Sequence, residues 1–426
     1  MILEIRLSNF FSIKDEVILN LRAGNINTQK SKQLGDNITH FNEEKVLKTI
    51  AIYGSNASGK SNVIKAVRFC AMMVFMSHAH NENTRFNFQP FKFKDYLKKP
   101  SSFLINFVSN GIEYEYSFTL TVTEIISEEL FYYPNGRRAK VFTRNENLGP
   151  EKSKIYSFGS AIKKPMDVAE NTSRKSLFIS RASQMDRIIG KELFNYFSTM
   201  FILGYYNIDI NFFEQLFSEN KELLLKTLKI ADNDIVDIKI QRESRMGKNV
   251  TADFTSNEAS IKDIDQDFVK ITSYHKASPE IPFDFDREES EGTKKAFFIM
   301  LTILDVVKNN KTLIIDELES SLHSRIVEYI VEVFHKGKNA QLIFSTHNTN
   351  LINFDLLRKD QIYFTNKQPD ASTELYSLYD YKEFRDTMDA EKAYLQGRFD
   401  AVPIVNDSVD SIYSLLNDQK KTNPKR

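Results

Sequence analysis

The sequence predicts an α/β protein with a mainly parallel sheet, an antiparallel β subdomain and a helical insertion. Three observations lead to this prediction. A strand, a glycine-bearing loop and a helix follow one another over residues 46–75, and strands and helices alternate again over residues 293–365. The segment 113–123 instead alternates apolar and polar residues. Alternating strands and helices form parallel sheets, whereas a strand with one apolar face belongs to an antiparallel sheet.

The first third of the chain is expected to supply the antiparallel subdomain. Period-two alternation and β-branched residues predict strands at residues 2–7, 17–21, 102–108, 113–123 and 128–133. Asn110-Gly111 lies between two of these strands and is a hairpin signal.

The rest of the chain returns to helices and then to βαβ units. Residues 183–230 are expected to be mainly helical, and residues 234–274 to form short strands. The last third predicts helix 293–308, strand 311–316, helix 322–336, strand 340–346, helix 348–357 and strand 361–365. One mostly parallel sheet built from both ends of the chain follows from this order.

Composition bounds the class of protein. Of the 426 residues, 41% are apolar, and 34 Phe and 18 Tyr are enough for a large core. The formal net charge is zero, which argues against a chain coated with nucleic-acid-binding charge but leaves a local basic groove open. The single cysteine, Cys70, allows no disulfide framework. There is no apolar run that could span a bilayer and no signal-peptide core, so we expect a soluble, cytoplasmic protein.

The most informative segment is the loop that follows the strand at 46–53. It fits the phosphate-binding pattern G-x-x-x-x-G-K-[ST], with helix-like spacing of apolar residues after it. Backbone N–H groups of such a loop wrap phosphates, Lys60 would reach the β- and γ-phosphates, and the Ser61 hydroxyl would bind Mg²⁺. The alternative is an ordinary glycine-containing turn. The residues expected to bind the nucleotide are Gly54, Ser55, Asn56, Ala57, Ser58, Gly59, Lys60 and Ser61.

A second apolar strand, residues 311–315, ends in two carboxylates, Asp316 and Glu317. The carboxyl ends of parallel strands meet at one edge of a sheet, which would bring these acids beside the phosphate loop. Asp316 would then hold Mg²⁺, through water, and Glu317 would orient and deprotonate the attacking water. The alternative is that the acids cap a helix.

Two further motifs flank this acidic pair. Ser290 and Gly292 precede a predicted helix, where they either cap it or donate to the γ-phosphate of a nucleotide bound by a second subunit. His347 ends the strand at 340–346 and is expected either to contact the γ-phosphate or to be structural.

Together these pieces resemble the ABC-type ATPase heads of SMC, RecF and OLD-like proteins. The similarity is greatest to the short bacterial AAA-type ATPases of anti-phage and abortive-infection systems (RloA-like, AbiL-like). The nucleotide-site motifs that carry it are the loop 54–62 with Asn62 after Lys60-Ser61, the Ser290-x-Gly292 signature, the Walker B pair Asp316-Glu317 and the switch histidine His347. It is also carried by Ser320-Ser321-Leu322-His323 in the D-loop position, the N-terminal Asn9-Phe10-Phe11-Ser12-Ile13 and the late segment 394–403.

The sequence departs from the family pattern at three points. The signature lacks the second glycine of the transporter form, His323 replaces the D-loop aspartate, and Phe11 replaces a basic residue. Gln89 is the candidate for the Q-loop glutamine that would contact the metal, although Gln89-Pro90-Phe91 could equally form an ordinary turn.

The resemblance implies an ATPase that binds ATP and Mg²⁺ and assembles as a homodimer, or a higher oligomer, through composite ATP sites. It implies the sensor subunit of an anti-phage system that controls a separate effector, a nuclease or toxin, with no membrane partner. The alternative is a RecF-like DNA-repair ATPase, so nucleic acid stays open as a ligand. Cations that could follow a phosphate backbone, or simply be solvated, are Arg174, Lys175, Arg181 and Arg187.

Four regions follow from these assignments. Residues 1–170 would form the N-terminal half of the ATPase head, with the phosphate loop and the antiparallel subdomain, and residues 171–280 a mainly helical insertion. Residues 281–408 would form the C-terminal half, with signature, Walker B and switch histidine, and residues 409–426 a flexible polar tail.

Overall fold

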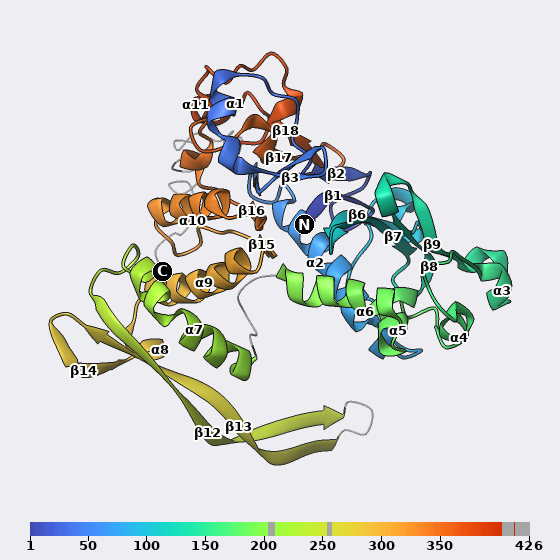
Figure 1. Cartoon of the computed structure of the whole chain (residues 1–426), viewed down its shortest axis with the longest axis horizontal. Helices are drawn as coiled ribbons and strands as arrows, with labels where there is room; N and C mark the ends of the chain where they lie inside the picture. The colour runs from blue at the N-terminus through green and yellow to red at the C-terminus, as the bar shows by residue number, and fades with distance from the viewer. Residues whose placement is uncertain (203–208, 254–257, 403–412, 414–426) are drawn as a thin grey trace, which may run out of the picture.

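A computed structural model describes residues 1–202, 209–253, 258–402 and 413 of the chain (Figure 1). Its largest sheet has seven antiparallel strands in the order β10-β9-β8-β7-β6-β1-β2. The strands are β1 (Ile2–Ser8), β2 (Val17–Asn20), β6 (Ser101–Ser109), β7 (Ile112–Leu120), β8 (Ile125–Tyr132), β9 (Ala139–Asn145) and β10 (Tyr156–Phe158). Asn110 and Gly111 both have positive φ between β6 and β7, which confirms the predicted hairpin.

The second sheet has six strands in the order β11-β15-β16-β5-β17-β18. All neighbours are parallel except β17 and β18. The strands are β5 (Thr49–Gly54), β11 (Phe201–Ile202), β15 (Thr312–Ile315), β16 (Gln341–Ser345), β17 (Ile362–Lys367) and β18 (Thr373–Ser377). The early strand β5 is therefore inserted between β16 and β17 from the end of the chain, in one mainly parallel sheet built from both ends, as the sequence predicts.

The parallel sheet is buried on both faces, between two hydrophobic cores. Along β5, Ile50 and Ile52 belong to the core shared with the antiparallel sheet, and Ala51 and Tyr53 to the core of the C-terminal half. The same alternation places Ile343 in the first core and its neighbours along β16 in the second. Because both faces are covered, these strands are continuous apolar runs.

The helices cover the two sheets. Among the longer ones, α2 (Lys60–Met76), α5 (Phe178–Gln184) and α6 (Ile188–Asn195) pack with the first core, and α7 (Ile210–Leu228), α9 (Glu291–Lys308) and α10 (Ser324–Lys336) with the second (Figure 1). The short elements are α1 (Gln29–Gln33), α3 (Lys152–Ile155), α4 (Pro165–Glu170), α8 (Phe285–Glu288), α11 (Ala390–Leu395) and the hairpin of β3 (Ile38–Phe41) with β4 (Glu44–Leu47).

A buried ionic network ties the antiparallel sheet to α5. Arg144 and Glu128 are fully buried, and Arg144 Nε donates to Glu146 at 2.8 Å. Glu128 accepts from the backbone N–H of Ile179 at 3.0 Å and from the Tyr116 hydroxyl at 2.9 Å. Burial raises the pKa of the Glu128 carboxyl. A carboxylate at a helix start is stabilised there by the unpaired backbone donors of the first turn.

Two predictions about elements are wrong. The predicted helix 348–357 is only a 3₁₀ turn at Thr349–Leu351. The side chains of Asn348 and Asn353 accept from backbone N–H groups two residues on, which favours turns over a helix. The short strands expected at 234–274 are instead one long ribbon, β12 (Ile235–Asp253) and β13 (Glu258–His275), with β14 (Ser278–Asp284) at its base.

The region 171–280 thus combines the helices α5, α6 and α7 with this long ribbon, which Figure 1 shows extending away from α7 and α9. Apolar and polar residues are mixed along both strands of the ribbon, so the sequence does not mark how far the pairing runs. The tail expected at 409–426 lies outside the described residues apart from Tyr413. None of the helices described has both the length and the apolar character that crossing a membrane requires.

Candidate functional site

The loop between β5 and α2 is held in place by two glycines that no other residue could replace without a shift. A Cβ on Gly54 would lie 2.3 Å from Thr365 Oγ1 of β17, and one on Gly59 would lie 2.0 Å from Thr373 Oγ1 of β18. Gly59 also has φ +109°, a conformation that disfavours L side chains. The glycines of the motif therefore serve close packing of the loop against β17 and β18.

Lys60 opens α2 and turns back over the loop. Its Nζ donates to the carbonyl oxygens of Gly54 at 2.8 Å and Ser55 at 3.1 Å. The residue is buried, and burial lowers the pKa of its ammonium group, while Asp316 and Glu317 oppose that shift. Its ammonium group is thus held inside the curve of the loop, where phosphate oxygens could replace the two carbonyls.

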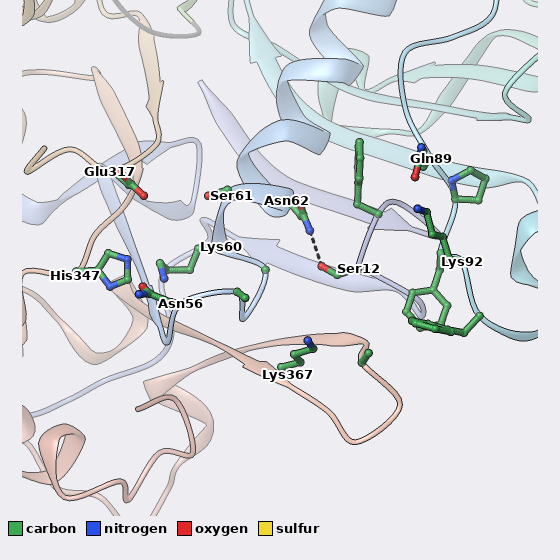
Figure 2. A pocket seen from close by; sticks show the side chains of 17 residues that line it. Ser12, Asn56, Lys60, Ser61, Asn62, Gln89, Lys92, Glu317, His347 and Lys367 are labelled. Atoms are coloured by element: carbon green, nitrogen blue, oxygen red, sulfur yellow. Dashed lines mark hydrogen bonds between the residues drawn. The ribbon is translucent and has the colours of Figure 1, made fainter. Parts of the chain in front are cut away.

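A pocket of about 770 Å³ opens beside this loop. Figure 2 shows Glu317 and His347 on one side of it, Lys60, Ser61 and Asn56 at its centre, and Gln89 and Lys92 on the opposite side. Of the predicted phosphate-loop residues, those that line it are Asn56, Ala57, Gly59, Lys60, Ser61 and Asn62. Gly54, Ser55 and Ser58 contribute through backbone contacts and packing instead.

The N-terminal segment 9–13 organises the opposite wall. Asn9 Oδ1 accepts from the backbone N–H of Phe91 at 2.9 Å, and the Phe11 N–H donates to the Gln89 carbonyl at 2.7 Å. Asn62 Nδ2 donates to Ser12 Oγ at 2.7 Å (Figure 2). These contacts join the start of α2 to the N-terminus. Gln89 lines the pocket, but its role toward a metal stays a prediction.

Asp316 and Glu317 follow β15 and are fixed by the neighbouring strand. Ser345 ends β16, and its hydroxyl donates to Asp316 Oδ1 and accepts from the Glu317 N–H at 2.8 Å. Glu317 has φ 50°, which turns the chain sharply at the strand end. Glu317 lines the pocket, whereas Asp316 lies beside it, held by Ser345. The parallel pairing of β15 and β16 therefore sets where both acids stand.

His347 lies two residues beyond β16 and lines the same pocket. Its backbone N–H donates to Glu319 Oε1. The other oxygen of Glu319, Oε2, is buried with no hydrogen-bond partner among the described residues. The segment after Walker B thus holds the segment that carries His347, and the two segments would move together.

Ser290 and Gly292 do not line this pocket. Ser290 caps α9, accepting from the Thr293 N–H at 3.0 Å, so the predicted capping is present. A Cβ on Gly292 would lie 3.0 Å from the carbonyl oxygen of Ser321, so the signature packs against the segment that follows Walker B. His323 in that segment caps α10, its Nδ1 accepting from the Arg325 N–H at 3.2 Å.

The residues present fit a nucleotide with its metal. A glycine cradle that a single Cβ would fill, a buried lysine beneath it and a hydroxyl at Ser61 together match what a triphosphate requires. Ser61 and Asp316 are the groups that would hold Mg²⁺, because hydroxyl, carboxylate and water oxygens are its preferred ligands.

Sequence reasoning missed several residues that hold the site. Ser345 fixes both acids, Glu319 holds the segment of His347, and Thr373 donates to the Ser58 carbonyl at 2.8 Å and contacts Ser12 Oγ at 2.7 Å. A small polar residue at the end of an apolar strand was the only signal for Ser345. Nothing in the sequence links Thr373 to a loop more than 300 residues earlier.

Comparisons with known proteins identify the family of the chain. A family model described as "AAA domain, putative AbiEii toxin, Type IV TA system" matches residues 50–353. No curated protein matches the chain. Among solved structures, the chain is similar to the SmcHead bound to the C-winged helix domain of ScpA, at 15% identity and a TM-score of 0.40, over 90% of this chain and 99% of that one. It is also similar to the SMC head domain from Thermotoga maritima, at 15% identity and a TM-score of 0.37, over 88% and 98% of the two chains. The family match spans β5, the phosphate loop and His347.

Proposed function

Because the chain belongs to the AAA family whose model it matches, we propose that this ATPase is an ABC-type molecular switch, in which ATP joins two copies of the chain. Each phosphate loop would face the Ser290 helix of the other copy. The γ-phosphate would then contact Lys60 and Ser61 of one chain and Ser290 and Gly292 of its partner. ATP binding would tighten the dimer and hydrolysis would loosen it, which is a two-state element biased by a ligand.

One observation carries the proposal. The pocket is lined by Lys60, Ser61, Glu317 and His347, whereas Ser290 and Gly292 do not line it, and Gly292 packs against the Ser321 carbonyl. The start of a helix that faces no ligand of its own chain is suited to the nucleotide of a second copy, because its free N–H groups favour an anion.

The residues divide the chemistry of hydrolysis among them. Lys60 and the loop N–H groups would hold the β- and γ-phosphates, and bound Mg²⁺ would neutralise part of their charge. Glu317, turned toward the pocket by its positive φ, would accept the proton of the attacking water. His347 would contact the γ-phosphate. When hydrolysis removes that phosphate, a movement of His347 would also move the segment after Walker B, because the His347 N–H donates to Glu319.

We propose that this switch is the sensor of an anti-phage defence system in the cytoplasm and controls a separate effector, a nuclease or toxin. The description of the family, which names a toxin of a type IV toxin–antitoxin system, supports a role of this kind. Nucleotide-dependent dimerisation would give the effector two states to distinguish.

A RecF-like role on DNA is less well supported. Arg174 pairs with Glu124 at 3.0 Å, and Arg187 pairs with Asp167. Lys175 donates to the Thr84 carbonyl at 2.9 Å. These cations are engaged within the chain, so they are less suited to follow a phosphate backbone. DNA-stimulated hydrolysis that falls steeply with salt would favour the alternative.

The test is the mass in solution by light scattering, with and without Mg-ATP, alongside phosphate release. We expect Glu317→Gln to form an ATP-locked dimer without turnover, because it binds ATP but lacks the base. Lys60→Ala should bind no ATP and stay in the nucleotide-free state. Glu328→Gln, on the exposed side of α10, is the matched control and should behave as wild type. An ATP-indifferent monomer in Glu317→Gln would overturn the switch, and full activity of that variant would overturn the assignment of the base.

A further inference from the structure

Among the residues that the structure describes, the inner half of the β12–β13 ribbon holds it to the rest of the chain, through its base and through Arg242, which pairs with Glu214 of α7 at 2.6 Å. Its two strands pair from Ile235 and His275 out to Asp253 and Glu258, while β14 pairs with the base alone, at Thr272 to His275. Figure 1 shows the outer part of the ribbon extending away from the helices. A two-stranded ribbon alone is marginally stable in water, so the contacts of its inner half must hold it in position.

At its base, the ribbon contacts the residue that precedes the signature motif. Glu289 immediately precedes Ser290, the cap of α9, and its side chain is only 6% exposed. Two side chains of β13 hold this carboxylate: the Ser273 hydroxyl donates to Oε1, and His275 Nε2 lies 2.8 Å from the same oxygen. Ser273 is fully buried. The end of the ribbon and the start of α9 are therefore joined by a buried carboxylate.

The segment that leads into the other strand, β12, contacts the same helix. Asp232, three residues before β12, accepts from the Thr293 hydroxyl at 3.1 Å. That hydroxyl also lies 2.8 Å from Ser290 Oγ. Since Thr293 gives its proton to Asp232, the Ser290 hydroxyl is the donor in their contact. The base of each strand is thus linked to a residue that flanks or contacts Ser290, β13 through Glu289 and β12 through Asp232 and Thr293.

We propose that Glu289, Ser273 and His275 are positioning residues that fix Ser290 for the composite ATP site, so that the place of the ribbon sets the place of the signature. This inference rests on the proposed function, in which Ser290 contacts the partner's ATP. Leaving the buried carboxylate of Glu289 without its donors would cost free energy, so Glu289 follows β13 when that strand shifts. The first turn of α9, which begins directly after Glu289, would then shift as well. A partner that pulls on the ribbon would therefore change how well the dimer holds ATP.

The test introduces Glu289→Gln into the Glu317→Gln chain and measures two quantities. We expect the dissociation constant of the ATP-bound dimer to rise about tenfold, the equivalent of one hydrogen bond to a charged group. The affinity of the monomer for Mg-ATP should not change, because the phosphate loop is untouched. In chains that keep Glu317, kcat should fall while KM stays. A purely structural role would not separate these readouts.

Two controls define the effect. Glu280→Gln makes the same chemical change on the exposed strand β14 and should alter nothing. Deleting the outer ribbon, by joining Arg242 to Val269 through Asn-Gly, keeps the base contacts and should leave the dimer within twofold of its parent. If Glu289→Gln unfolds in thermal melting, Ser273→Ala removes one donor and should weaken the dimer in the same direction.

The outcomes are distinct. A Glu317→Gln parent that fails to dimerise with ATP overturns the proposed function and this inference with it. A parent that dimerises equally well with and without Glu289→Gln, or an outer deletion as damaging as Glu289→Gln, overturns the inference alone.

Discussion

The phosphate loop tolerates no side chain at Gly59, and the cost of adding one can be worked from its surroundings. In Gly59→Ala the new Cβ would lie 2.0 Å from Thr373 Oγ1 and 2.7 Å from its Cγ2, at φ +109°. A left-handed conformation costs an L residue about 1–2 kcal/mol, and overfilling a packed site costs about 1–3 kcal/mol more. We therefore expect a total of about 2–5 kcal/mol.

That cost can appear in either of two measurements. If the loop stays in place, urea unfolding reports it as lost stability. If the loop moves away from β18, calorimetric titration reports it as weaker Mg-ATP binding, by about 30-fold or more. The loss of unfolding free energy and the loss of Mg-ATP binding free energy should together reach about 2 kcal/mol or more.

A matched control separates backbone strain from the contact with β18. Gly136 has φ +75°, and a Cβ added there would meet nothing within 4 Å, so Gly136→Ala should cost only the strain and leave ATP binding unchanged. Adding Thr373→Ala to Gly59→Ala removes the two nearest atoms and should recover part of the loss. Equal effects of Gly59→Ala and Gly136→Ala would refute the close-contact argument.

Two further predictions concern stability. Arg144→Met leaves the buried carboxylate of Glu128 without its cationic partner and should cost about 3–5 kcal/mol in urea unfolding, partly recovered by adding Glu128→Gln. A loss under about 1 kcal/mol would contradict this. His335 is buried, with Nε2 2.8 Å from Thr49 Oγ1, and burial lowers its pKa to about 3. Between pH 6.5 and about 3 the unfolded chain then binds a proton that the folded chain does not, so stability should fall as the pH falls, by about 1.4 kcal/mol per unit. Unfolding at pH 7.5 and 5.5 should show this loss in wild type and a smaller one in His335→Gln, and identical pH dependence would contradict it.

Much of the parallel sheet could be predicted because burial on both faces leaves a local trace. The strands β5, β15 and β16 are buried throughout and mainly apolar, and each is followed by a motif of the residue types that phosphate or metal chemistry requires. The length of the ribbon could not be predicted, because pairing that continues beyond the core leaves no burial period that marks where it ends. The turn at Thr349–Leu351 replaced a helix because Asn348 and Asn353 bond to their own backbone.

The sequence by itself determined which residues are proposed to carry the chemistry. They are Lys60 and Ser61 in a glycine loop and Asp316 and Glu317 after a buried strand, because these residue types at these spacings match what a triphosphate requires. Only the tertiary structure decided what holds them. Ser345 reaches Asp316 and Glu317, and Thr373 reaches Ser58, across strands distant in the chain. Such contacts depend on which strands become neighbours, and strand order is a property of the whole sheet rather than of any segment within it.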